Sequence, residues 1–420
     1  MFKRYINIGK VQWALLLALS GVAAPVFAQL KLIGVGVHAG GLSAERQEAQ
    51  LALVKQAHLG SVRFDLQWRY VETTQGQYSI PTATERFVDS AIKLGIEPVI
   101  ILDYGNSFYD GGDKPRSQEA INAFVRYAAF VVTHFRGRVH QFEVWNEWDN
   151  HTGGYPAASP EDYASVFKAA YPVLKKANAD AKIIVGSGVR QGWGGRLAEL
   201  GVVQMGDGLA IHPYNYQIAD DRAPEHCVQN IVRLEQRLRS LTHQANVDLY
   251  VTEIGWPTNL GRFGARESAV GSYASRLTLL TLSLPYVKGL WWYDLVDDGT
   301  DPFNKEHNFG LFHTDLKPKP SAIAISAAAE FADTHALSLV APSELDAGRI
   351  VIEATRRKDA QQSLLIWDLI GNNDRIDIDC ASSGAVRVGT RTSAASVMPA
   401  VPTVVTAQSN QCVRHPVDPS

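Results

Sequence analysis

EPVIILDYG at residues 97–105 and VHQFEVWNE at residues 139–147 decide the fold, because each is a short apolar run that ends in polar and aromatic residues. Similar runs recur along the chain: LIGVGVH from residue 32, SVRFDLQW from 61, KIIVGSG from 182, GDGLAIHPYN from 206, VDLYVTEIGW from 247 and KGLWWYDLVDDG from 288. Short runs rich in β-branched and aromatic residues are typical of buried strands. The sequence therefore predicts eight strands.

Segments with helical periodicity separate most of these strands: residues 43–59, 83–94, 118–135, 160–177, 225–242, 265–282 and 319–332. At residue 160 the start of a helix is well marked, since Ser159 can cap it and Pro160 suits its first position. Strands that alternate with helices indicate a parallel sheet. Eight such units, about 37 residues each, close a (β/α)8 TIM barrel. An open doubly wound sheet is the alternative, but no Gly-rich phosphate loop follows the first strand.

The pattern changes near the C-terminus. Segments such as GRIVIEAT at residues 348–355 and QSLLIWDLIG at 362–371 alternate apolar and polar residues, and helical periodicity is lost. Such alternation is typical of antiparallel strands with one buried face. We therefore expect a barrel at residues 29–335 and a small antiparallel β-rich accessory domain at residues 336–420.

The N-terminus has the pattern of a secretory signal peptide. Basic residues precede an apolar run at residues 11–24, and small residues lead to a cleavage site after Ala28. A membrane anchor is the alternative, but the run of 14 residues is shorter than the roughly 20 that a spanning helix needs. We predict a signal peptide at residues 1–28 and a periplasmic or secreted protein with no membrane association after cleavage.

Composition excludes several classes of protein and ligand. With 46% apolar and 20% charged residues the chain is globular, and its net charge of −3 without a basic cluster argues against nucleic acid as a partner. Its cysteines are too few for a disulfide scaffold or a zinc site. Cys380 and Cys412 can pair in an oxidising compartment, whereas Cys227 is expected to be buried in a helix. We expect a monomer.

In such barrels the catalytic groups lie at the C-terminal ends of the strands. Glu147 ends the fourth predicted strand and Glu253 ends the seventh. Two acids across an aromatic-lined barrel mouth suit cleavage of a glycosidic bond: one protonates the leaving oxygen, and the other attacks or stabilises the sugar carbon. Other residues at strand ends are candidates for substrate binding: Arg63, Tyr104, Asn146, Trp148, His212, Tyr214, Trp256 and Trp292.

Several of these residues have a structural alternative. Tyr104, Trp148 and Trp256 can stack on a sugar or pack in the core, and His212 can be an ordinary core histidine. Trp292 is adjacent to another tryptophan, so that only one of the two can face the barrel lumen; we place Trp292 there.

Neighbouring charged residues also have alternatives. Glu143 lies four residues before Glu147 on the same inward face, and we expect it to pair with an arginine such as Arg63. The polar loop at residues 297–308 borders the cleft or is an ordinary surface loop. Histidines outside the predicted site lack metal-like spacing, so no metal or other cofactor is predicted: His38, His151 and His307.

Two of the strand ends resemble known motifs. FEVWNE at residues 142–147 resembles the strand-four signature of retaining glycoside hydrolases of clan A, and YVTEIGW at residues 250–256 resembles their strand-seven motif. The resemblance covers about residues 30 to 335. It is strongest to family 39-type glycosidases, including those of bacterial exopolysaccharide clusters, although GWP at residues 255–257 also resembles family 17 β-1,3-glucanases. Trp148 stands where proline is common in this clan.

The resemblance implies roles for individual residues. Glu147 corresponds to the acid/base, Glu253 to the nucleophile and Arg63 to the arginine that supports the nucleophile, while His212 and Tyr214 match the strand-six position. We expect Arg63 to favour the charged form of Glu253, and the charge of Glu253 to raise the pKa of Glu147 so that Glu147 is protonated at rest.

The function predicted from the sequence is therefore a retaining β-glycosidase. We expect it to act on an extracellular or periplasmic polysaccharide, within the chain, with Asn146 bonded to the sugar 2-hydroxyl. An exo-acting enzyme, a β-1,3-glucanase and a catalytically inactive carbohydrate-binding barrel are the alternatives. The intact pair of glutamates argues against the inactive barrel.

Overall fold

The computed structural model describes residues 31–152, 156–190, 192–218, 222–340, 342, 345, 348–368, 375–380, 386–388, 395–397, 402–408 and 411–416. The predicted signal peptide lies outside this part of the chain, as do the side chains of Cys380 and Cys412 and hence their predicted pairing. In the described part, no helix is long and apolar enough to cross a membrane.

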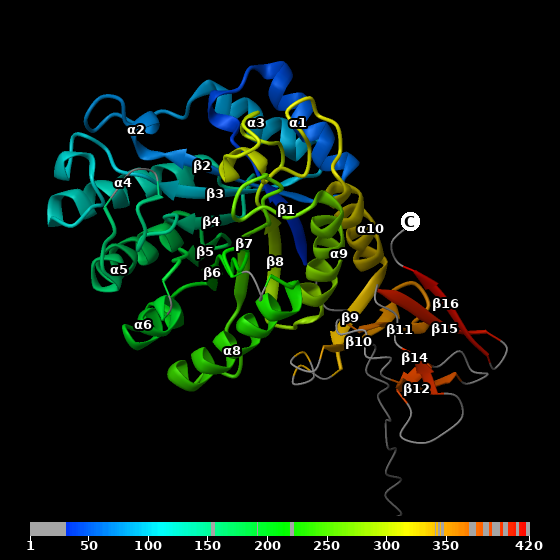
Figure 1. Cartoon of the computed structure of the whole chain (residues 1–420). Helices are drawn as coiled ribbons and strands as arrows, with labels where there is room; N and C mark the ends of the chain where they lie inside the picture. Colours follow the sequence, from blue (N-terminus) through cyan, green and yellow to red (C-terminus); the bar gives the residue numbers. More distant parts are fainter. Residues whose placement is uncertain are drawn as a thin grey trace, which may run out of the picture.

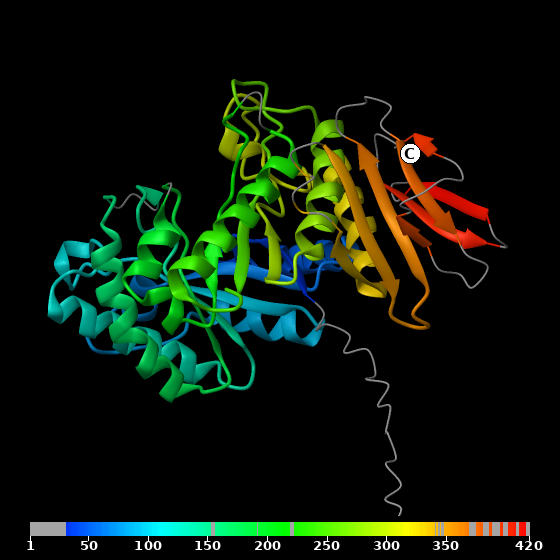
Figure 2. The same ribbon diagram turned by 90° about the horizontal axis from the view of Figure 1, so that it is seen from below.

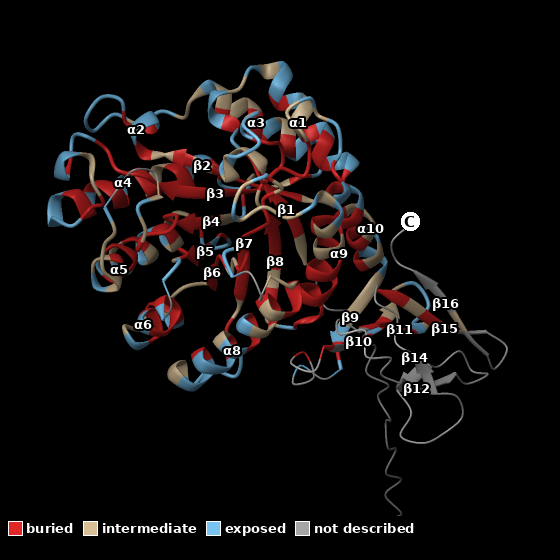
Figure 3. Ribbon diagram, viewed as in Figure 1, coloured by how far each residue is buried: buried red, intermediate tan, exposed pale blue. Residues whose placement is uncertain are grey.

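Eight parallel strands close into a barrel in chain order, with β1 paired to β8 (Figure 1). The barrel strands are β1 (Leu32–Gly36), β2 (Ser61–Gln67), β3 (Glu97–Asp103), β4 (Gln141–Val144), β5 (Lys182–Val185), β6 (Leu209–Ile211), β7 (Leu249–Ile254) and β8 (Val287–Trp292). This closed order confirms the predicted (β/α)8 barrel and excludes the open doubly wound sheet. The strands form the buried centre of the molecule (Figure 3).

The helices surround the barrel. They are α1 (Ala44–Gln56), α2 (Trp68–Val71), α3 (Thr82–Lys93), α4 (Gln118–His134), α5 (Pro160–Ala177), α6 (Trp193–Glu199), α7 (Val202–Met205), α8 (Pro224–Thr242), α9 (Glu267–Ser283) and α10 (Pro320–Thr334), with short 3-10 turns η1 (Ala39–Gly41), η2 (Asp110–Gly112) and η4 (Lys305–Asn308).

The start of α5 confirms the predicted cap. Ser159 accepts a hydrogen bond from the backbone N–H of Asp162, and the Asp162 side chain bonds back to the N–H of Ser159. Helices α6 and α7, in contrast, were not predicted. They are short, and Gly194 and Gly195 within α6 weaken its helical pattern.

The lower barrel lumen is filled by Trp291 rather than by Trp292. The Trp291 indole N–H donates to the Ser61 hydroxyl at 2.9 Å, and its ring occupies space that a side chain at Gly34 would need. A Cβ at Gly34 would lie 2.4 Å from that ring. Since adjacent strand residues face opposite sides, Trp292 points outward, and our placement of Trp292 in the lumen is wrong.

A β-rich part follows the barrel directly, because β9 begins at His335, the residue after the end of α10. One antiparallel sheet has the order β16-β15-β11-β10-β9 and a second has the order β13-β12-β14. The strands are β9 (His335–Leu339), β10 (Arg349–Arg356), β11 (Gln362–Asp368), β12 (Arg375–Cys380), β13 (Val386–Val388), β14 (Ala395–Val397), β15 (Thr403–Gln408) and β16 (Gln411–Pro416).

The five-stranded sheet lies against α9 and α10 (Figure 2). Ile350 and Trp367, on β10 and β11, belong to the same buried apolar cluster as the barrel. The Trp367 indole N–H also donates to Glu225 of α8 at 2.9 Å, and Arg276 of α9 lies 3.3 Å from the same carboxylate oxygen. The sheet and the barrel therefore share one core. Cys227 is buried in α8, as expected.

Candidate active site

A cavity of about 540 Å³ lies at the C-terminal ends of the barrel strands. Several residues predicted for the site line it: Arg63, Tyr104, Asn146, Glu147, Tyr214 and Glu253. His212 is buried beneath them and contacts both glutamates. The structure thus brings together the polar part of the predicted site.

The backbone after β4 turns Glu147 into the cavity. Trp145 and Glu147 have φ angles of 70° and 47°, in the left-handed region that non-glycine residues rarely occupy. Such residues cost about 1–3 kcal/mol each and cluster at functional sites, where the surrounding structure holds them. Here the Ser187 hydroxyl accepts the N–H of Glu147 at 3.4 Å.

Arg63 joins the two sides of the site. Its Nε donates to Glu143 at 2.7 Å, one terminal nitrogen donates to Glu253 at 2.7 Å and the other donates to Asn146 at 3.0 Å. Both Arg63 and Glu143 are buried, so the predicted structural pairing of Glu143 is confirmed. The amide N–H of Asn146 in turn bonds to the Tyr104 hydroxyl at 3.2 Å.

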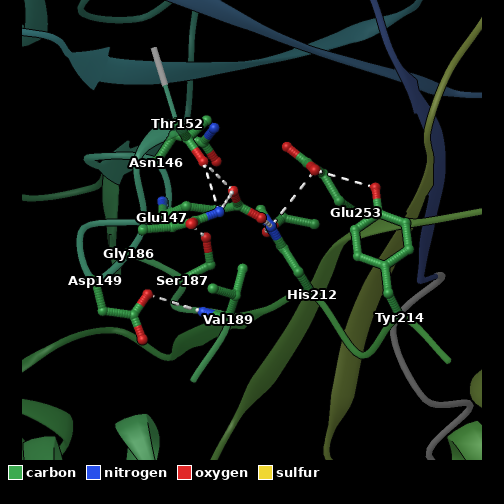
Figure 4. A network of polar contacts seen from close by, with 12 residues as sticks. Asn146, Glu147, Asp149, Thr152, Gly186, Ser187, Val189, His212, Tyr214 and Glu253 are labelled. Carbon is green, nitrogen blue, oxygen red and sulfur yellow. Dashed lines mark hydrogen bonds and ion pairs between the residues drawn. The ribbon is translucent and has the colours of Figure 1, made fainter. Parts of the chain in front are cut away.

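His212 lies between the two glutamates (Figure 4). Its Nδ1 is 3.0 Å from Glu147 Oε1 and 3.4 Å from Glu253 Oε2, and its Nε2 is 3.1 Å from the Thr252 hydroxyl. Tyr214 donates its hydroxyl proton to Glu253 at 3.1 Å. One donor atom each from Glu147, His212 and Glu253 lies within 4.8 Å of the others.

The pKa values of Glu147 and His212, which contact each other, are shifted in opposite directions. Burial favours the neutral form of Glu147, but the hydrogen bond and positive charge of His212 outweigh it and lower the pKa of Glu147 to about 2. For His212, burial lowers the pKa, and the negative charges of Glu253 and Glu147 more than compensate and raise it. The expected rise in the pKa of Glu147 is not found, because the hydrogen bond and charge of His212, which lies between the two carboxylates, shift this pKa downward.

The three tryptophans predicted to bind substrate lie in the core instead. Trp148 is fully buried and packs edge-on against Tyr163, with ring centroids 5.5 Å apart. Trp256 packs on Tyr273 of α9 and on Trp292, outside the barrel wall. None of them lines the cavity. For Trp148 and Trp256 the packing alternative holds, and the substrate-binding assignment is wrong.

Other residues line the cavity that the sequence did not single out as binding residues. Tyr293 directly follows β8, two residues after Trp291, so that continuing the strand alternation of the sequence would have placed it on the lumen side. The hydroxyl of Thr152 donates to Glu147, and no pattern marks it. Lys305 and Glu306 also line the cavity, so the loop at residues 297–308 borders the cleft.

Two groups of side chains within the described part of the chain have the geometry to hold a metal ion. One consists of Glu147, His212 and Glu253, and the other brings His38 together with two aspartates that follow β8. The spacing of these residues along the chain predicts no metal site. Spacing does not reveal donor atoms that follow β1 and β8, because these strands are far apart in the sequence but adjacent in the barrel.

A closed (β/α)8 barrel with glutamates at the ends of β4 and β7, facing one cavity, defines a clan A glycoside hydrolase. The family model described as Cellulase (glycosyl hydrolase family 5) matches residues 23–281. The chain belongs to this family. The predicted clan is thereby confirmed, and family 39, which the motifs resemble most, is found among the similar structures.

Solved structures share the fold at low sequence identity. A family 39 glycoside hydrolase from the gut symbiont Bacteroides cellulosilyticus WH2 is 24% identical over 92% of this chain and 79% of its own, with a TM-score of 0.67. A family 5, subfamily 18 structure from Streptomyces cattleya, in complex with GlcNAc, is 15% identical over 73% and 81%, with a TM-score of 0.60. A monomeric β-xylosidase from Caulobacter crescentus CB15 is 16% identical over 78% and 74%, with a TM-score of 0.56. A search of curated proteins found no significant match.

Proposed function

We propose that this glycoside hydrolase is a retaining β-glycosidase that cleaves a polysaccharide in the periplasm or outside the cell. The observation that carries this proposal is the closeness of the glutamates, since an oxygen of Glu147 lies within 4.8 Å of one of Glu253. Retaining enzymes place their carboxyl groups about 5–5.5 Å apart, and inverting enzymes about 6.5–9.5 Å apart to admit a water molecule. The short separation favours double displacement.

In this mechanism Glu253 is the nucleophile. Arg63 and Tyr214 both donate hydrogen bonds to its carboxylate, which fixes its orientation toward the cavity. Glu253 attacks the anomeric carbon while the leaving oxygen accepts a proton from Glu147. The products of this step are a covalent glycosyl-enzyme ester and a released alcohol.

The proton for the leaving group begins on His212. With this proton on Nδ1, which lies 3.0 Å from Glu147 Oε1, a short shift along the hydrogen bond makes Glu147 the acid as the leaving oxygen gains negative charge. Once Glu253 is an ester, it has lost the negative charge that stabilised a proton on His212 or Glu147. Glu147 then removes a proton from water, which attacks the anomeric carbon and frees Glu253.

Action within a polysaccharide chain is supported by a second cavity of about 670 Å³ beside the first. Asp149 and Arg190 line it, and their chain neighbours Asn150 and Val189 line the catalytic cavity. The second cavity thus lies on the Glu147 side, where the leaving part of a longer substrate would extend. We propose an endo-acting monomer that needs no cofactor for this reaction.

The experiment is release of reducing ends from a panel of β-linked glycans, including β-1,3-glucan and bacterial exopolysaccharides, with Glu253→Gln as the inactive control. A ladder of oligosaccharides supports endo action, whereas a single small sugar from the first time point indicates an exo-acting enzyme. Binding to a glycan without any cleavage by the wild type would instead indicate a carbohydrate-binding barrel.

A further inference from the structure

Three side chains meet at the barrel mouth where β8 adjoins β1. His38 follows β1, and Asp294 and Asp298 follow β8. The Nε2 atom of His38 is 3.3 Å from an oxygen of Asp298 and 3.7 Å from one of Asp294. These donor atoms all lie within 4.8 Å of one another, so small side-chain rotations would let them share one ion.

Asp294 is the unusual member of the group. Only 2% of it is exposed, and among the described residues its Oδ1 has no hydrogen-bond partner, while its Oδ2 is directed at His38. The nearby Lys319 is already paired with Asp297 at 2.7 Å. A bare carboxylate here is costly and requires a proton or a cation.

We propose that His38, Asp294 and Asp298 bind a divalent transition-metal ion at the rim of the catalytic cavity. Imidazole together with two carboxylates is a donor set that suits Zn²⁺ or Mn²⁺. A divalent ion shared by the three side chains would give the buried Asp294 carboxylate a directly bound cation.

The position of this group connects it to the substrate. His38 lines the catalytic cavity, and its ring contacts that of Tyr293, another lining residue, with centroids 6.1 Å apart. An ion bound there would tie the loop at residues 297–308 to the end of β1. The remaining coordination positions would face the cavity, where sugar hydroxyls can reach them. The metal proposal does not depend on the retaining mechanism.

Binding of Mn²⁺ to the full-length mature protein, after treatment with EDTA, tests the proposal by calorimetry and by the loss of the free Mn²⁺ signal in electron paramagnetic resonance. We expect one equivalent to bind and to raise the melting temperature. His38→Asn and Asp298→Asn should each weaken binding about tenfold or more. The matched control is His140→Asn, since His140 is similarly exposed and also faces a carboxylate, at 3.0 Å; it should bind as the wild type does.

Two results would overturn the proposal. One is the absence of one-equivalent binding of Mn²⁺ or Zn²⁺ by the wild type. The other is binding that survives His38→Asn and Asp298→Asn but is lost in Glu147→Gln, which would place the ion between the catalytic glutamates instead.

Discussion

Replacing Arg63 by methionine should destabilise the barrel strongly. The substitution keeps most of the side-chain volume but removes the hydrogen bonds to Glu143, Glu253 and Asn146. Glu143 is fully buried and would lose its only cationic contact among the ion pairs of the described residues. A buried charge without a partner must either be desolvated at high cost or take up a proton.

The expected loss follows from this geometry. Removing one partner of a buried ion pair costs about 3–5 kcal/mol, because the other charge remains buried. Arg63 has two such partners, which places the effect toward the upper part of this range. That is a large share of the roughly 5–15 kcal/mol by which a domain is stable.

Urea unfolding at pH 7, followed by tryptophan fluorescence, measures this loss. The matched control is Arg196→Met, since Arg196 also bonds two glutamates, Glu161 and Glu199, but on an exposed surface. It should unfold at nearly the wild-type urea concentration, because exposed pairs contribute little. A loss below about 1 kcal/mol for Arg63→Met would refute the view that Arg63 holds the site together.

Four further substitutions test the site. Glu147→Ala should still cleave aryl glycosides with activated leaving groups, and azide should rescue it to give a β-glycosyl azide, whereas Glu253→Gln should lose both chemical steps. Formation of an α-glycosyl azide by Glu147→Ala would instead show that Glu147 is the nucleophile and Glu253 the acid/base. His212 has a pKa raised above its ordinary 6.5, so its contribution to stability is full below pH 6.5 and lost as pH rises through the raised value. The difference in unfolding free energy between wild type and His212→Asn should therefore shrink above pH 6.5, and an unchanged difference would contradict the shift. Trp148→Phe should lower the melting temperature, because Trp148 is fully buried. A raised KM with an unchanged melting temperature would instead indicate that Trp148 stacks on the sugar.

The sequence predicted most of the barrel because its strands are short apolar runs with polar ends. The same logic located Glu147 and Glu253, since the ends of parallel strands meet at one face of a barrel. Arg63 and Glu143 could also be paired in advance, because both face inward and a buried carboxylate requires a cation.

Other features depend on distances that a sequence does not contain. Trp291 and Trp292 are adjacent and equally apolar, and the choice between them depends on the space left at Gly34. The low pKa of Glu147 depends on the 3.0 Å contact with His212, which comes from a different strand. The hydroxyl of Thr152 reaches Glu147 from a loop without any recognisable pattern.

The anomeric configuration of the first product tests the central claim most directly. Proton NMR during the first minutes of hydrolysis of a cleavable β-glycoside distinguishes the α and β anomers before they equilibrate. Double displacement by Glu253 and Glu147 predicts that the β anomer appears first and that the α anomer grows in only by mutarotation. Initial formation of the α anomer would show inversion and would contradict the roles given to both glutamates.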